Sequence, residues 1–145
     1  MYGAMPAAAA GARHNPGPMS RLLLIFTDPR RQPLWRGLLL TLLLGVTTLA
    51  LSPAPPRTLD TGWDKANHLL AFGSLAFCGV WAFWPQPRQW GWLVLALLAY
   101  GVGIEIAQGF MPPREADLRD VLADGLGIAL GLLLAWPLAR HAARR

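Results

Sequence analysis

The sequence predicts an all-α membrane protein, a bundle of four transmembrane helices with both termini in the cytoplasm. The chain has 145 residues, of which 54% are hydrophobic and 14% are charged, whereas about a quarter of the residues in a soluble domain are charged. Four long apolar segments follow one another, and prolines lie at or near their ends. Basic residues are unequally distributed between the two ends of these segments, which predicts an orientation in the membrane. The length fits one small membrane domain behind a tail.

The chain before the first apolar segment is divided into two parts. Residues 1–20 are rich in Ala, Gly and Pro and show no apolar period, so we expect a disordered tail, with Met19 as a candidate true start of translation. Residues 21–33 include an apolar run too short to span a bilayer, and we expect an interfacial segment there. The membrane domain is expected over residues 34–138, followed by a basic cytoplasmic tail over residues 139–145.

The four predicted spans cover residues 34–52, 64–84, 89–110 and 117–138. Proline is the expected stop signal, and the spans end at Pro53, Pro85 and Pro112, with Pro137 near the exit of the fourth. The strictly uncharged stretch within each segment has only 15 or 16 residues, whereas a span needs about 20. Spans two to four therefore include ionisable side chains, which we expect at the membrane shoulder and turned toward one another.

The distribution of lysine and arginine predicts the orientation of the bundle. Nine of these residues lie on the side of the two termini and the loop at Arg88, against four on the other side, and basic residues favour the cytoplasmic side. Every tryptophan except Trp63 lies near the same basic side, as in an interfacial belt. Every acidic residue except Asp28 lies on the opposite, outer half. The inner half has almost no polar residues, which argues against a transport path.

Acidic, basic and amide side chains gather at the outer ends of spans two to four. Spacings of three and four place the members of each set on one helix face, and carboxyl groups at membrane depth are functional hypotheses by default. Three of these residues, His68, Glu105 and Asp120, are candidates for a catalytic role. The candidate ligand-binding residues are Asp64, Lys65, His68, Glu105, Gln108, Arg114, Asp117, Asp120 and Asp124.

Structural roles compete with functional ones at the helix starts. Thr61 followed by Asp64 resembles a capping box, and an acid in the first turn suits the positive helix end. Asp117 followed by Asp120 is typical of an N-cap with an acid at the third helical position. A cap does not require Asp124, which continues down the same face.

Structural roles are also open for the deeper residues. Glu105 can lock helices together by hydrogen bonding to Arg114 or His68, and Gln108 can orient a ligand or satisfy Glu105. Gly127 and Gly131 form a G-x-x-x-G pattern, for which we expect close helix packing.

Several of these residues together resemble the VanZ-like family of small bacterial membrane proteins. The family's second-helix motif is D-K-x-x-H-x-x-x-F, and its second half contains I-E-x-x-Q followed by R-x-x-D-x-x-D. The residues that match these motifs are Asp64, Lys65, His68, Phe72, Ile104, Glu105, Gln108, Arg114, Asp117 and Asp120. The family pattern usually has Asn where this chain has Asp124. The resemblance covers about residues 35–138 and implies a four-helix envelope protein of the bacterial cytoplasmic membrane with a role in resistance to glycopeptides such as teicoplanin.

Three functions are consistent with these residues. As a binding module, the chain would use Lys65, Arg114 and Arg119 to hold a phosphate, pyrophosphate or carboxylate of an envelope lipid or cell-wall precursor. As an enzyme on a lipid-linked phosphate substrate, it would use His68 as a general base oriented by Glu105 or Asp120. The third function is a structural or assembly role in the envelope.

No cofactor is expected, because the chain has neither a Gly-rich phosphate loop nor an HExxH-type zinc pattern. A divalent ion held by His68, Glu105, Asp120 and Asp124 belongs only to the enzyme alternative. Nucleic acid is not an expected partner, because the net charge of +5 comes from basic residues that flank apolar segments. Membrane lipids are the expected partners.

Overall fold

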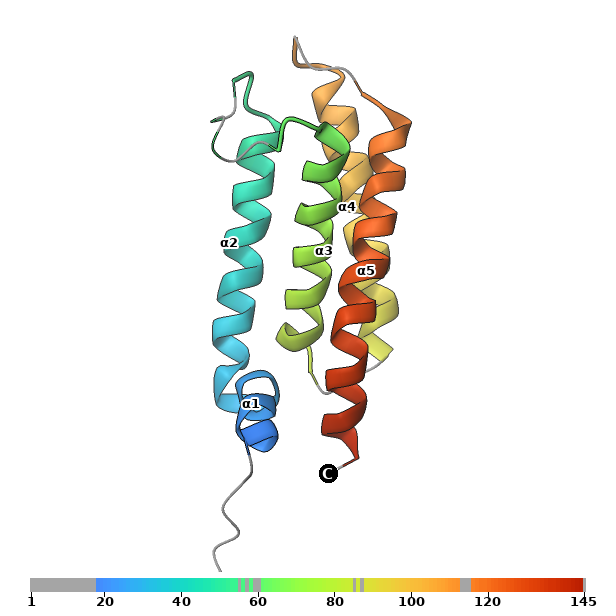
Figure 1. Ribbon diagram of the computed structural model, residues 1–145. Helices are drawn as coiled ribbons and strands as arrows, with labels where there is room; N and C mark the ends of the chain where they lie inside the picture. Colours follow the sequence, from blue (N-terminus) through green and yellow to red (C-terminus); the bar gives the residue numbers. More distant parts are fainter. Residues whose placement is uncertain are drawn as a thin grey trace, which may run out of the picture.

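The computed structural model describes residues 18–54, 56, 58, 61–84, 86, 88–112 and 116–144, which contain helices and no strand. The helices are α1 (Pro18–Thr27), the 3-10 helix η1 (Pro29–Arg31), α2 (Gln32–Ala50), α3 (Asp64–Ala82), α4 (Arg88–Gln108) and α5 (Leu118–Ala143). Figure 1 shows α2, α3, α4 and α5 side by side in a bundle, with α1 at the end where α5 finishes. The all-α prediction is confirmed.

Among the described residues, three helical segments are long and apolar enough to cross a membrane by length and composition, namely Pro29–Ala50, α4 and α5. α3 is not among them, because its first turns contain Asp64, Lys65, Asn67 and His68. It is instead the central helix of the bundle, packing most extensively against α5 and also against α2 and α4. These three apolar helices are compatible with a membrane protein, while four spans and cytoplasmic termini stay predictions.

Leucines cover the outward face of α5 from its first turn. Leu118, Leu122, Leu126, Leu130 and Leu134 are all exposed, and their spacing of four places them in one stripe. Apolar patches of this extent are unusual on a surface that faces water. The stripe therefore fits contact with lipid.

Glycines bring α3 and α5 into close contact. A Cβ atom added at Gly127 would lie 2.5 Å from the Leu69 carbonyl oxygen and 3.1 Å from the Gly73 amide nitrogen. A Cβ at Gly131 would meet the Gly73 carbonyl and the Ala76 side chain. The predicted packing role of Gly127 and Gly131 is confirmed, since the backbones could not approach this closely with larger residues.

α5 continues past the proline that we expected near its end. Pro137 lies inside the helix, which runs on to Ala143, so this proline does not end the helix, while the predicted end of the span at residue 138 stays a prediction. Proline removes one backbone donor and crowds the preceding turn, but membrane helices tolerate this where the local geometry adjusts. Proline spacing alone therefore does not fix the helix end.

The start of α3 also differs from the prediction. Its N-cap is Trp63, with no side-chain cap, so the capping box between Thr61 and Asp64 is wrong. The Thr61 hydroxyl instead donates to the Trp63 carbonyl at 2.9 Å and accepts from the Trp63 amide at 3.2 Å. A tight turn through Gly62, whose φ is 76°, brings these groups together before the helix begins.

Aromatic side chains fill the opposite end of the bundle. Phe26 of α1 lies 5.5 Å from the Trp35 ring and 4.8 Å from the Trp81 ring, measured between centroids. Arg36 of α2 donates to the Ala82 carbonyl at the end of α3, at 3.1 Å. α1 thus packs onto the bundle, and the interfacial position of residues 21–33 stays a prediction.

Candidate functional site

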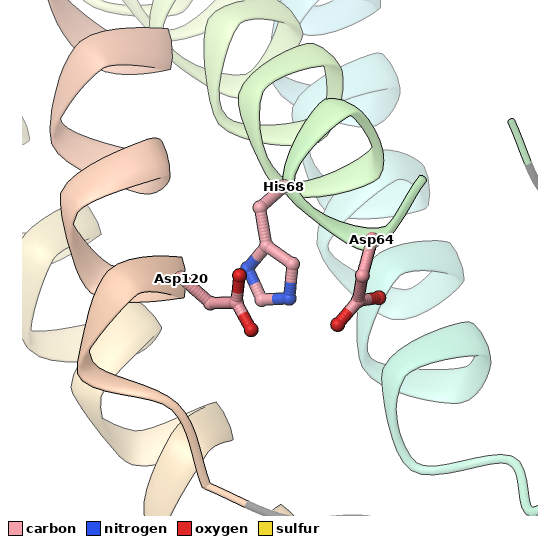
Figure 2. Close-up of side chains that lie close together, drawn as sticks. All are labelled: Asp64, His68 and Asp120. Atoms are coloured by element: carbon pink, nitrogen blue, oxygen red, sulfur yellow. The ribbon is translucent and has the colours of Figure 1, made fainter. Parts of the chain in front are cut away.

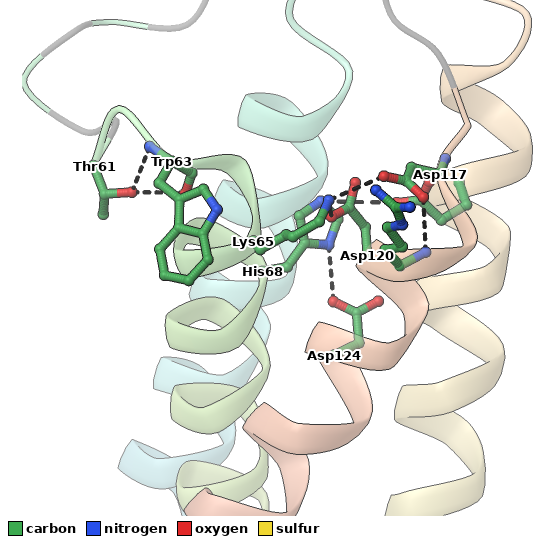
Figure 3. A network of polar contacts seen from close by, with 9 residues as sticks. Thr61, Trp63, Lys65, His68, Asp117, Asp120 and Asp124 are labelled. Atoms are coloured by element: carbon green, nitrogen blue, oxygen red, sulfur yellow. Dashed lines mark hydrogen bonds and ion pairs between the residues drawn. The ribbon is translucent and has the colours of Figure 1, made fainter.

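Polar side chains from α3, α4 and α5 meet at the end of the bundle where α3 and α5 begin and α4 ends (Figure 3). All the buried polar or charged residues among the described part of the chain lie here: His68, Glu105, Gln108, Asp120 and Asp124. His68 Nε2 is 3.7 Å from Glu105 Oε1, and His68 and Asp120 offer ligand atoms within 4.8 Å of each other. His68 thus lies close to both Glu105 and Asp120, as expected, while a shared pocket on the outer side and a site role stay predictions.

The innermost contact joins His68 of α3 to Asp124 of α5. His68 Nδ1 lies 2.8 Å from Asp124 Oδ1, and the dashed line in Figure 3 marks this bond. Asp124 is fully buried, and none of the described residues forms a hydrogen bond with its Oδ2. A Cβ at Gly101 of α4 would collide with Oδ2, so this glycine provides the space for the carboxyl group. Asp124 therefore fixes the orientation of the imidazole ring.

Lys65 connects the start of α3 to the start of α5. Its Nζ lies 3.0 Å from Asp117 Oδ2 and 3.0 Å from Asp120 Oδ1. The ammonium group is therefore paired with two carboxylates of the protein. The sequence suggested Lys65 as a phosphate-binding group, but this pairing makes the ammonium group less available to a phosphate.

Asp117 is the N-cap of α5, as predicted. Its Oδ1 accepts a hydrogen bond from the Arg119 backbone N–H at 2.8 Å. That hydrogen bond, followed by the bond from Lys65, lowers the pKa of the Asp117 carboxyl. Asp120 does not complete a capping box, because the Asp117 backbone N–H donates to Glu105 at 2.9 Å instead.

Glu105 links the end of α4 to the start of α5 through this hydrogen bond. Its Oε2 accepts the Asp117 N–H, whereas Oε1 is buried and has no hydrogen-bond partner among the residues that the structure describes. The sequence suggested Arg114 or His68 as its hydrogen-bond partner. The Asp117 backbone amide is the hydrogen-bond partner of Glu105, and His68 lies at ion-pair distance, 3.7 Å away. Arg114 lies outside the described residues.

Gln108 closes the end of α2. Its Nε2 donates to the Ala50 carbonyl at 3.0 Å, which satisfies one of the free carbonyls at that helix end. The alternative in which Gln108 satisfies Glu105 is therefore wrong. Its partner could not be predicted from spacing, because it depends on how α2 and α4 are aligned.

A cavity of about 320 Å³ lies beside the polar cluster, between α2, α3 and α4. Its walls are mostly apolar and include Leu42, Val46, Leu49, Ala71, Phe72 and Ile104. Asp64, Asn67, His68 and Gln108 line its polar part. The cavity is therefore apolar over most of its wall and polar where the candidate site residues line it.

Asn67 was not selected from the sequence, although it lines the cavity. Its Oδ1 accepts a hydrogen bond from the Thr61 backbone N–H at 3.0 Å. Its place three residues after Asp64 and next to His68 was the available signal. No comparable signal in the sequence indicated that α2 lines the cavity, because its lining residues are apolar like the rest of that helix.

Carboxyl groups outnumber cations in the described part of this cluster. Lys65, Arg119 and His68 are the nearby basic residues. The carboxyl groups are those of Asp64, Glu105, Asp117, Asp120 and Asp124. Such a site suits a cation or a hydrogen-bond donor.

Comparisons with known proteins identify relatives. The sequence pattern of the VanZ/LLP1 family matches residues 18–140. An uncharacterized protein of Schizosaccharomyces pombe is 31% identical over 100 residues, and the alignment covers 68% of this chain and 60% of the yeast protein. This chain therefore spans less than two thirds of that relative's length. No solved structure matches this chain.

Proposed function

The chain belongs to the VanZ/LLP1 family, and from this membership and the geometry of the site we propose that it is a multi-pass membrane protein that binds an envelope lipid. The acyl chain of the lipid occupies the apolar cavity between α2, α3 and α4. The polar head group lies at the Asp64 and His68 end of the cavity.

The amphipathic cavity carries this proposal. Leu42 and Val46 of α2, together with Phe72 of α3, offer an apolar wall, and Asp64 and His68 offer polar groups in the same space. The acyl chain of a membrane lipid would be held in this space by van der Waals packing, because it already lies in hydrocarbon before it binds. A volume of about 320 Å³ lies within the ordinary size range of ligand sites.

A lipid is a better candidate than a cell-wall precursor. The relative in Schizosaccharomyces pombe belongs to a fungus, whose wall contains no peptidoglycan, whereas phospholipids occur in fungal and bacterial membranes alike. The family resemblance also suggests glycopeptide resistance. That resistance would then be an indirect effect of lipid binding on the membrane.

The proposed topology has four spans, with both termini in the cytoplasm of a bacterial cell. The basic asymmetry of nine residues against four supports this orientation. α1 and the end of α5 lie at the same end of the bundle (Figure 1), as an even number of spans requires. The polar cluster and the cavity would then face the outer leaflet.

Native mass spectrometry of the purified full-length protein tests lipid binding. We expect a co-purified lipid on the wild type and its loss in Ala71→Trp, which fills the cavity. Leu126→Trp is the matched control, because Leu126 is exposed on α5 and should retain the lipid. A wild type without lipid, or Ala71→Trp with the wild-type amount, would contradict the proposal.

A second candidate function is hydrolysis of a lipid-linked phosphate. The 2.8 Å contact between His68 and Asp124 supplies an oriented base beside the cavity. Release of phosphate from a lipid-linked pyrophosphate by the wild type, and its loss in His68→Gln, would favour this enzyme. The absence of any release would exclude it for that substrate.

A further inference from the structure

Three potential metal ligands lie together at the polar end of the bundle. Asp64 and His68 of α3 and Asp120 of α5 each offer a ligand atom, and these atoms lie within 4.8 Å of one another (Figure 2). Figure 2 shows the imidazole ring between the two carboxyl groups. Imidazole nitrogen and carboxylate oxygen together are ligands for ions such as Mn²⁺ and Zn²⁺.

The hydrogen bond to Asp124 occupies one ring nitrogen of His68 and leaves the other nitrogen available to bind an ion. His68 Nδ1 is 2.8 Å from Asp124 Oδ1, so Nε2 is the atom that can bind an ion. Metal-binding histidines usually donate their other ring N–H to a carboxylate or carbonyl, which fixes the tautomer and the ring orientation. Asp124 is therefore a positioning residue rather than a ligand.

A buried carboxylate oxygen of Glu105 also lies close to His68. Glu105 is 5% exposed, and within the described part of the chain its Oε1 has no hydrogen-bond partner. This oxygen lies 3.7 Å from His68 Nε2, the nitrogen available to an ion. Leaving a buried acceptor unsatisfied is costly, and a cation next to Nε2 would remove that cost.

We propose that Asp64, His68 Nε2 and Asp120 bind one divalent cation of the Mn²⁺ or Zn²⁺ type, with the Glu105 carboxylate beside it. Lys65 contacts only Oδ1 of Asp120, which leaves Oδ2 for the ion. This ion site does not depend on the proposed lipid binding. The ion would also bring positive charge to the polar part of the cavity, where a phosphate head group would need it.

Titration of the metal-free, full-length protein with Mn²⁺, followed by the paramagnetic resonance signal of the free ion, tests this site. We expect one Mn²⁺ per chain in the wild type. Asp64→Asn should weaken binding by about tenfold or more, and the positioning variant Asp124→Asn by about 10- to 100-fold. A competition titration with Zn²⁺ should displace the Mn²⁺.

Asp28→Asn is the matched control, because Asp28 caps η1 at the far end of the bundle and Asn also caps helices well. Its affinity should equal that of the wild type. Asp64 is exposed, so Asp64→Asn should fold even where changes at buried positions do not. Absence of saturable binding to the wild type, or wild-type affinity in Asp64→Asn, would overturn the proposal.

Discussion

Asp117 joins three helices through its side chain and its backbone. Its carboxyl group caps α5 and pairs with Lys65 of α3, while its N–H donates to Glu105 of α4. The sequence predicted the cap, because an acid before an apolar helical run is a local signal. The other two contacts depend on how the three helices are rotated and aligned, which spacing along one helix does not specify.

The lowered pKa of Asp117 predicts a pH dependence of stability. The Arg119 backbone N–H, and then Lys65, stabilise its charged form. A carboxyl group with a lower pKa in the folded than in the unfolded chain stabilises the fold above the unfolded pKa, and this contribution is lost as the pH falls through the folded pKa. We expect the thermal midpoint of the wild type in detergent to fall more steeply between about pH 5 and pH 3 than that of Asp117→Asn. Parallel pH profiles would contradict this account.

Glu105 can be tested by two substitutions with different structural effects. In Glu105→Gln the side-chain carbonyl can still accept the Asp117 N–H, so the free energy of unfolding should change by less than about 1 kcal/mol. Glu105→Ala removes the acceptor and should cost about 1–3 kcal/mol. The thermal midpoint and an immunoblot of the membrane fraction measure both effects. Equal losses in the two variants would show that the hydrogen bond is not what stabilises this end of the bundle.

At the scale of the helices, the contact between α3 and α5 depends on small residues. Gly127→Ala should destabilise the protein by about 1–3 kcal/mol, as overpacking usually does, because its Cβ would lie 2.5 Å from the Leu69 carbonyl oxygen. Gly125→Ala is the matched control, since its Cβ would meet only the Leu98 side chain at 3.9 Å. Thermal unfolding in detergent should separate the two variants, and similar midpoints would contradict the packing account.

Most elements could be predicted from the sequence, but their ends and their neighbours could not. Apolar length predicted a helix near each of α2, α3, α4 and α5. Pro137 did not end α5, because one lost hydrogen bond does not outweigh the packing of the flanking turns. The cavity wall on α2 was not predicted, because Leu42 and Val46 have the same character as leucines that face lipid.

At the scale of the whole molecule, the distribution of basic residues predicts that both termini lie in the cytoplasm. A reporter that functions only in the cytoplasm should be active when it is fused at the C-terminus. A reporter that functions only outside the cytoplasm should be inactive at the same position, because of the positive-inside distribution. The reverse pattern would place the polar cluster at the inner leaflet instead.

We propose that one lipid occupies the cavity beside the polar cluster, in addition to the lipids around the bundle. Crosslinking in native membranes with a phospholipid that carries a photoreactive acyl chain tests it directly, with the labelled peptides identified by mass spectrometry. We predict labels at cavity residues such as Val46 and Ile104 that are lost in Ala71→Trp, while labels on the exposed stripe at Leu126 and Leu130 persist. Labels confined to the stripe, or cavity labels unchanged in Ala71→Trp, would contradict it.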